Sequence, residues 1–327
     1  MSRCHGSTSY EPPSSKKTLV TDPSPDRSGG ASQGEGLKMT GSELLQWSTN
    51  TLKDHRVENP RLNAELLLAH SLNLNREELY VRLRRDVQER EKEVLEGLIQ
   101  RRISGEPLQY ILGHQEFWSI NFRVDPRVLI PRQETELLVE QSLWILSEKT
   151  FEHNPSVLEI GTGSGAIAIA LAKEAKHLFL VATDISRDAL ILARENAKTA
   201  GVERQIEFVN GDLFGPLRPS REKKRFNLIL SNPPYIVRHK ICTLAKEVKD
   251  HEPTIALNGG EDGLAFYRRI IPEAPGYLQA GGWLLLEVAL GQGSDVSDLM
   301  EEEGSFFKPE CIPDLSGIGR VLKARRK

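Results

Sequence analysis

The spacing of apolar residues predicts two structural regions of different kinds. From Met39 to about Gly113, apolar positions recur every three or four residues, as in "SELLQWSTNTLKDH", which predicts amphipathic helices. The stretch "NPRLNAELLLAHSL" begins with Asn59 at an N-cap and Pro60 at the first helical position. Short helices joined by short connections predict a small helical bundle over residues 39–113.

The pattern changes in "EFWSINFRVDPRVLIP", where β-forming residues replace the helical period. Asp125-Pro126 marks a turn. This segment predicts a β-hairpin linker over residues 114–131.

From residue 132 to residue 327, short apolar runs alternate with helical stretches. The runs "SVLEIG", "LFLVATD", "IEFVNGD", "FNLILSNPP" and "GGWLLLEVAL" predict strands, and "FFKPECIP" with "GIGRVLKARR" predicts a terminal antiparallel pair. Alternation of this kind indicates an α/β fold in which helices cover both faces of a mostly parallel sheet, here of seven strands. Ligands in such sheets bind at the carboxyl ends of the strands.

Residues 1–38 have almost no apolar periodicity and are rich in Ser, Pro, Gly and Lys. They predict a disordered leader, either a tail or a segment upstream of a true start at Met39. The leader has no apolar core of a secretory signal, and acidic residues interrupt it, unlike a mitochondrial transit peptide. We therefore expect the protein in the cytoplasm rather than in a mitochondrion or plastid.

Composition argues against several classes of function. The net charge of −3 gives no basic surplus of the kind that nucleic-acid binders carry. The three cysteines form no CxxC pair, so neither a metal site nor a disulfide framework is predicted. No apolar run approaches the ~18 residues that a membrane span requires.

The stretch "LEIGTGSGAIAIA" follows the first strand of the sheet and opens a helix. Its glycines, Gly161, Gly163 and Gly165, allow a tight turn and close approach to a ligand. A Walker site is excluded because no GK[ST] follows. A nicotinamide dinucleotide stays open at this point, because Gly161, Gly163 and Ala166 satisfy G-x-G-x-x-G/A and Asp184 follows at a suitable distance.

Three acidic residues favour S-adenosylmethionine over a dinucleotide. Glu159, Asp184 and Asp212 are each expected where one of three consecutive strands ends. Glu159 could hold a cationic ligand and would lie awkwardly beside a pyrophosphate. Asp184 can accept from ribose hydroxyls, and Asp212 with Leu213 can hold an adenine.

The fourth strand runs into "SNPPY", residues 231–235. The Asn232 side-chain oxygen and the Pro233 carbonyl can accept the two N–H groups of a planar nitrogen, and Tyr235 offers a face for packing. Such a nitrogen is a poor nucleophile, so orientation toward a methyl donor supplies much of the acceleration. The motif resembles the [DNS]PPY motif of methyltransferases that act on amino and amide nitrogens of nucleic acids or proteins.

Several further stretches resemble the HemK/PrmC family of protein glutamine methyltransferases. They are "LQYILGHQEFW", "VLIPRQETELLVE", "EPTIALNGGEDGLAFYRRII" and the helical region that starts with "ELLQWSTNTLKDHRVENPRLNAELLLAH". The resemblance covers the chain from about Met39 to its end, with the motifs in the family's order. It implies a Rossmann-like class I methyltransferase fold over residues 132–327 and methylation of the N5 amide of the Gly-Gly-Gln glutamine in class-I peptide release factors, modulating translation termination.

The resemblance also implies the site. The expected cofactor-binding residues are Glu159, Gly161, Thr162, Gly163, Ser164, Gly165, Asp184, Asp212, Leu213 and Asn232; the expected catalytic residues are Asn232, Pro233 and Tyr235; and the expected substrate-binding residues are Asn232, Pro233, Pro234, Tyr235 and Arg132. The helical region, residues 39–113, would contact the release factor.

Two alternatives remain open on sequence grounds. A nucleic-acid amino-methyltransferase, acting on adenine N6 or guanine N2, could use the same SNPPY chemistry, although it would need a basic recognition face. A catalytically inactive binding module with the same fold is the other. We expect a monomer whose partner is a release factor, with no membrane association and no direct contact to nucleic acid.

Overall fold

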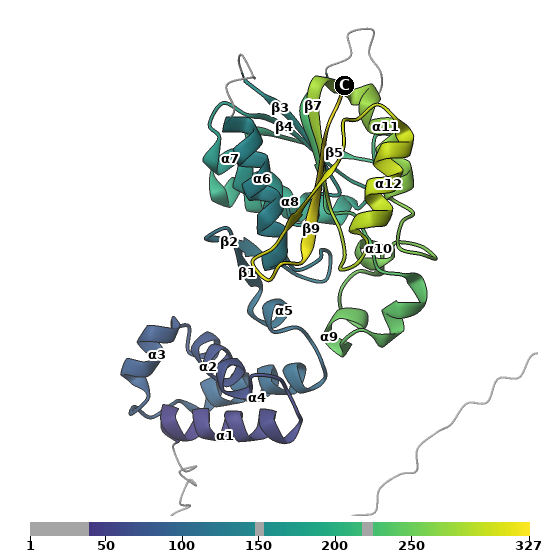
Figure 1. The fold of residues 1–327 in the computed structure, drawn as a ribbon. Coiled ribbons are helices and arrows are strands. Elements are labelled where there is room, and N and C mark those ends of the chain that lie inside the picture. The colour runs from purple at the N-terminus through teal and green to yellow at the C-terminus, as the bar shows by residue number, and fades with distance from the viewer. Residues whose placement is uncertain (1–38, 148–153, 218–224) are drawn as a thin grey trace, which may run out of the picture. The chain divides into compact units, whose positions relative to one another are not determined.

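The computed structural model describes residues 39–147, 154–217 and 225–327. The predicted leader, residues 1–38, lies outside the described residues. Figure 1 shows the fold.

The N-terminal part of the described chain is helical. It comprises α1 (Gly41–Asp54), α2 (Pro60–Ser71), α3 (Arg76–Arg82), α4 (Glu89–Ile103) and α5 (Leu108–Leu112). Thr40 forms a capping box with Glu43 at the start of α1, which satisfies backbone N–H groups that the first turn leaves free. The amphipathic faces meet in a leucine-rich core that includes Leu44, Leu67 and Leu95, each fully buried.

The hairpin that follows consists of β1 (His114–Phe117) and β2 (Ile120–Arg123), paired antiparallel. Its turn falls at Trp118 and Ser119, both with positive φ. The predicted turn at Asp125-Pro126 is also present, beyond β2, where Val128 N donates to Asp125 O at 3.1 Å. Phe117 and Phe122 pack edge to face across the pair, with ring centroids 6.1 Å apart.

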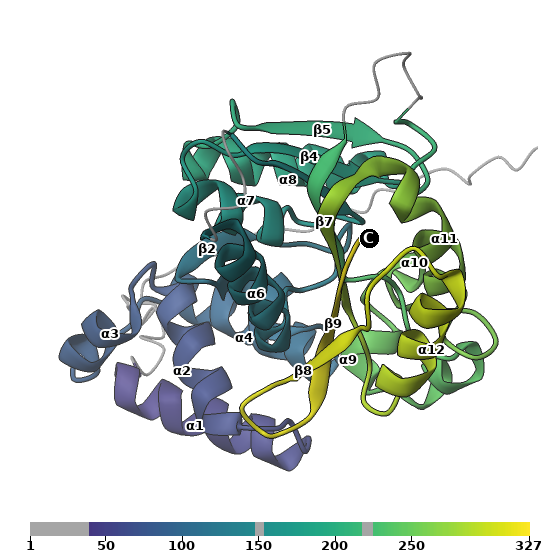
Figure 2. The same cartoon turned by 45° about the horizontal axis from the view of Figure 1, so that its top comes forward.

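The rest of the chain forms the seven-stranded sheet. Its strands are β3 (Ser156–Ile160), β4 (Phe179–Asp184), β5 (Ile206–Asn210), β6 (Phe226–Ser231), β7 (Leu278–Glu287), β8 (Glu310–Pro313) and β9 (Gly319–Arg325), in the order β5-β4-β3-β6-β7-β9-β8. The first five are parallel, whereas β9 runs antiparallel to both β7 and β8. The mostly parallel sheet and the terminal antiparallel pair are therefore confirmed. Figure 2 shows β5 and β8 at opposite edges.

Helices cover both faces of this sheet, as Figure 1 shows. One face carries η1 (Gln133–Thr135), α6 (Glu136–Ser147), α7 (Ala166–Glu174) and α8 (Arg187–Ala200); the other carries α11 (Tyr267–Tyr277) and α12 (Gly293–Glu303). Between β6 and α11 the chain forms η2 (Arg238–Thr243), α9 (Lys246–Lys249) and α10 (Thr254–Leu257). Chain order runs outward from β3 to β5 on one side and from β6 to β7 on the other, so the switch point lies between β3 and β6, where ligands bind in such folds.

Candidate active site

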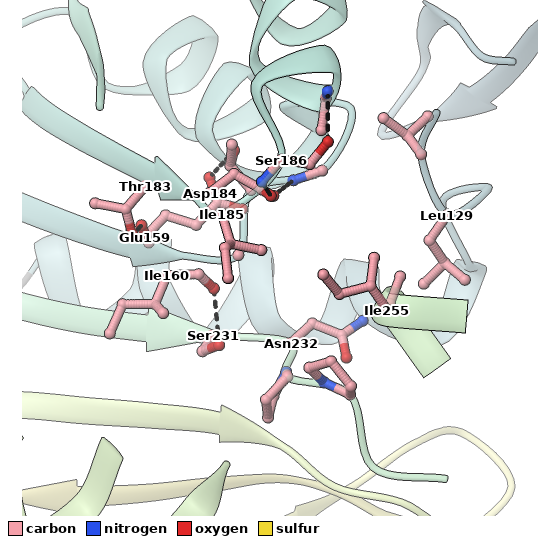
Figure 3. A pocket seen from close by; sticks show the side chains of 18 of the residues that line it. Leu129, Glu159, Ile160, Thr183, Asp184, Ile185, Ser186, Ser231, Asn232 and Ile255 are labelled. Atoms are coloured by element: carbon pink, nitrogen blue, oxygen red, sulfur yellow. Dashed lines mark hydrogen bonds between the residues drawn. The ribbon is translucent and has the colours of Figure 1, made fainter. Parts of the chain in front are cut away.

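A cavity of about 330 Å³ lies where β3, β4 and β6 end. This volume is in the range of small-molecule sites, and most of the lining is apolar. Figure 3 shows Ile185 and Ile255 facing the space between Asp184 and Asn232. The cavity therefore has an acidic residue on one side and the start of the SNPPY segment on another.

The glycine-rich turn forms one wall of the cavity. Gly163 has φ +55, and a Cβ built on it would meet nothing within 4 Å, so the backbone conformation itself is what favours glycine there. At Gly165 packing adds to conformation, because a Cβ would lie 3.0 Å from Ile169 Cδ1 and 3.2 Å from Ala193 Cβ. The turn therefore leaves its backbone uncrowded at Gly163 and allows α7 and α8 to pack closely at Gly165.

Asp184, the last residue of β4, is held by backbone donors. Gly163 N donates to its Oδ2 and Ser186 N to its Oδ1, both at 2.8 Å. Burial raises the pKa of Asp184, and these backbone bonds oppose the rise. Each carboxylate oxygen keeps a lone pair that can accept from a ligand hydroxyl.

Glu159 is the second-last residue of β3, because the strand continues to Ile160; the expectation that it ends the strand is corrected. Its Oε2 accepts from Thr162 Oγ1 at 2.7 Å and from Ala168 N at 3.1 Å. Burial raises the pKa of Glu159 to about 7. The side chain therefore ties the glycine turn to the first turn of α7 while still lining the cavity.

Asp212 and Leu213 lie just beyond β5, which ends at Asn210. Asp212 Oδ2 pairs with Arg269 Nη2 at 2.5 Å, and Leu213 has a left-handed φ of +48, which is unusual outside glycine. Arg269 and Phe266, both from the region of α11, also line the cavity. Neither was among the predicted site residues, although both lie in the stretch "EPTIALNGGEDGLAFYRRII", because nothing in the sequence shows that this distant segment reaches the cavity.

The SNPPY segment leaves the sheet at Ser231, whose Oγ donates to Ile160 O at 2.8 Å. Asn232 Nδ2 donates to Thr135 Oγ1 at 3.1 Å, and Asn232 Oδ1 accepts no hydrogen bond from the residues that the structure describes. Pro233 and Pro234 line the cavity together with Asn232. Thr135 lies within the stretch "VLIPRQETELLVE" but was not among the predicted site residues; in the structure it holds the Asn232 amide.

Tyr235 is not among the residues that line the cavity. It is largely buried, and its hydroxyl donates to Glu287 Oε1 at 3.4 Å. Its backbone is covered by a glycine-rich loop: a Cβ on Gly259 would lie 2.7 Å from Tyr235 Cα, and one on Gly263 would lie 2.5 Å from Tyr235 O. Only glycine fits at these two positions, which explains the "NGGEDG" stretch.

Arg132 lines the cavity and forms an ion pair with Glu252, with 2.5 Å between Nη2 and Oε1. Glu252 is 5% exposed, and its Oε2 has no hydrogen-bond partner among the described residues. Burial raises the pKa of Glu252, and Arg132 opposes the rise. The pair joins the segment before η1 to the segment before α10.

Fold and cavity together define a class I S-adenosylmethionine-dependent methyltransferase. Residues 43–113 match the family described as PrmC N-terminal domain, and residues 135–251 match the methyltransferase small domain. A release factor glutamine methyltransferase of Geobacter sulfurreducens is 43% identical over 283 residues, covering 86% of this chain and 95% of the relative. One of Koribacter versatilis is 41% identical over 288 residues, covering 88% and 99%. The chain belongs to the family of release factor glutamine methyltransferases.

Solved structures agree with the fold. The catalytic domain of hMettl16, solved with a MAT2A 3′UTR hairpin, has a TM-score of 0.51 at 14% identity and covers 69% of this chain and 81% of that one. At this identity the likeness concerns the fold alone.

The methyl donor of this class is S-adenosylmethionine, and the residues present fit it. The cavity offers buried carboxylates with free lone pairs, a glycine turn that nothing crowds at Gly161 or Gly163, and apolar side chains for a flat base. Within the described ranges, no group of three or more His, Cys, Asp or Glu residues could hold a metal ion. No helix in the same ranges is long and apolar enough to cross a bilayer.

Proposed function

We propose that this chain transfers a methyl group from S-adenosylmethionine to the side-chain amide nitrogen of the glutamine in the Gly-Gly-Gln motif of class-I peptide release factors. The relatives named for this activity match the chain over almost their whole length. The observation that carries the proposal is that Asn232 lines the cavity while Thr135 accepts from its Nδ2, so its Oδ1 stays available as an acceptor.

The cofactor would be held by the wall from Glu159 to Gly165, by Asp184, and by Asp212 with Leu213. Asp184 would accept from ribose hydroxyls, since backbone N–H groups already fix its carboxylate. Leu213 and Phe266 would enclose the adenine. When bound, S-adenosylmethionine supplies a methyl group on a positively charged sulfur.

The substrate amide would be held by the SNPPY segment. The lone pair of a glutamine amide nitrogen is delocalised, so the nitrogen attacks poorly in its planar form. Asn232 Oδ1 and the Pro233 carbonyl would accept its two N–H groups, fixing its direction and favouring the pyramidal geometry of the transition state. Acceptors placed in advance accelerate reaction without a strong base, because orientation and electrostatics contribute most of the gain.

The finer assignments extend this proposal. Arg132 would shape the mouth of the substrate site through its pair with Glu252. Tyr235 would support the segment from behind, since it does not line the cavity. The helical part, residues 39–113, would contact the release factor, the hairpin region 114–131 would link it to residues 132–327, and the protein would act as a cytoplasmic monomer.

A transfer assay tests the proposed function against its nearest rival. Purified protein is incubated with radiolabelled S-adenosylmethionine and one of three substrates: a class-I release factor, the same factor with its Gly-Gly-Gln glutamine replaced by alanine, or duplex DNA. We expect label only in the unaltered factor. Label in DNA and not in the factor would instead establish the nucleic-acid activity, which the relatives do not favour.

A further inference from the structure

A second buried carboxylate, Glu287, lies beside the amide-binding segment. It is the last residue of β7 and is only 2% exposed. The neighbouring strand β6 runs parallel, and Ser231 pairs in register with Leu286. Asn232 follows Ser231 directly beyond the end of β6, and Glu287 follows Leu286 as the last residue of β7, so the sheet brings the two close together.

Two residues beside Glu287, Tyr235 and Thr135, belong to the amide clamp, by which we mean Asn232 and Pro233 with the residues that support them. Tyr235 Oη donates to its Oε1, while Oε2 has no hydrogen-bond partner among the described residues. The Thr135 side chain faces the carboxylate and is the strongest influence that lowers the pKa of Glu287. From α11, Tyr267 Oη donates to the backbone oxygen of Glu287 at 2.7 Å.

Charged groups around Glu287 do not compensate for its burial. Arg320 of β9 lowers the pKa of Glu287, and Glu134 raises it. Burial is the largest influence and raises the pKa to about 7. The carboxylate thus changes its charge within the pH range in which such an enzyme can be assayed.

The hydrogen-bond directions give this charge a consequence for Asn232. Thr135 Oγ1 accepts from Asn232 Nδ2, so the Thr135 hydroxyl proton is free to be donated elsewhere. An ionised carboxylate only accepts hydrogen bonds, whereas a protonated one also donates. Ionised Glu287 can therefore accept hydrogen bonds from both Tyr235 and Thr135. With the second of these bonds, Asn232 Nδ2 would donate to Thr135 and Thr135 would donate to Glu287.

We propose that Glu287 is a positioning residue for the amide clamp: in its ionised form it orients Thr135 and Tyr235, and through Thr135 it holds the Asn232 oxygen toward the substrate amide. The inference rests on the proposed function and assigns a part of the site that no motif marks. It requires no proton transfer from substrate to Glu287. Protonation of Glu287 adds a donor beside Thr135 and loosens the orientation of Asn232.

The kinetic test uses Glu287→Gln, which is neutral at every pH and similar in volume. The wild-type kcat should fall as pH drops below about 7, whereas Glu287→Gln should lack that dependence and lose about tenfold in kcat at pH 8. Its affinity for S-adenosylmethionine, measured by calorimetry, should stay within twofold of wild type. The exposed Glu301→Gln on α12 is the matched control and should follow the wild-type profile. A Glu287→Gln enzyme with wild-type kcat and an unchanged profile would overturn the proposal.

A spectroscopic test separates this proposal from the proposed function, because it needs neither cofactor nor substrate. The side-chain amide resonances of Asn232 are followed by NMR as pH is varied. They should shift with a midpoint near the pKa of Glu287, and the shift should vanish in both Glu287→Gln and Thr135→Val. If the pH-dependent shift is present in wild type and absent in both variants, but wild-type protein fails to methylate a release factor, only the proposed function is wrong. If the resonances do not respond to pH in wild type, Glu287 does not position Asn232.

Discussion

Replacing Glu159 by glutamine should stabilise the folded protein, and the gain should grow with pH. Both hydrogen bonds to Glu159 end on one oxygen, Oε2, which a glutamine carbonyl can replace. What the substitution removes is the charge of a residue that is 1% exposed. Burial raises the pKa of Glu159 from its ordinary 4.5 to about 7, so the folded state binds a proton more tightly than the unfolded state.

The magnitude follows from this difference. Ionisation of Glu159 lowers the free energy of the folded state only above about pH 7, whereas it lowers the free energy of the unfolded chain from about pH 4.5 upward. Stability is therefore lost as pH rises through this window. At about 1.4 kcal/mol for each tenfold change in proton affinity, the loss reaches about 3 kcal/mol at pH 8 and is under about 1 kcal/mol at pH 5.

Urea unfolding followed by tryptophan fluorescence at pH 5 and pH 8 measures the effect. We expect the unfolding free energy of Glu159→Gln to be higher than that of wild type. This difference should be about 2 kcal/mol larger at pH 8 than at pH 5. The control is Glu140→Gln on the exposed side of α6, which should change stability by less than about 0.5 kcal/mol at both pH values. Equal differences between Glu159→Gln and wild type at the two pH values would refute the argument from burial.

Three further substitutions test other parts of the structure. Asn232→Ala should lower kcat by about 10²–10³-fold with only a few-fold loss in cofactor affinity, because it removes an acceptor that acts on the reacting nitrogen; single-turnover kinetics and calorimetry measure the two, and near-normal turnover would exclude the role. Gly163→Ala should cost about 1 kcal/mol in urea unfolding, through its φ of +55 and not through crowding; a loss above about 3 kcal/mol would contradict this. Leu67→Ala should cost about 2–5 kcal/mol, since Leu67 is fully buried, whereas the exposed Leu62→Ala should cost far less; equal losses would exclude this core.

Much of the sheet could be predicted because each buried strand is a short apolar run between polar turns. The ends of the strands and the position of the hairpin turn were less predictable. The pattern suggested that β7 begins at the two glycines, Gly281 and Gly282, but the strand begins at Leu278. It includes both glycines because Gly281 takes a φ of +75 and the strand continues past a register shift. The hairpin turn at Trp118 and Ser119 uses positive φ in two residues that seldom adopt it, so no turn signal marked it.

In the candidate site, the predictable residues are those that follow a strand directly. Asp184 and Asn232 lie at or just after strand ends, where side chains of a parallel sheet converge. Thr135, Phe266 and Arg269 reach the cavity from distant segments, and only the three-dimensional fold brings them there. Glu287 carried no such signal, because it lies inside the apolar run "GGWLLLEVAL", and only the structure shows that β7 ends at this residue.

The most direct measurement of the central claim is mass spectrometry of a release factor after incubation with this protein and S-adenosylmethionine. The account predicts that one methyl group is added, that fragmentation places it on the glutamine of the Gly-Gly-Gln motif, and that Asn232→Ala protein leaves that peptide unmodified. A methyl group on any other residue, or an unmodified glutamine after complete cofactor turnover, would contradict it.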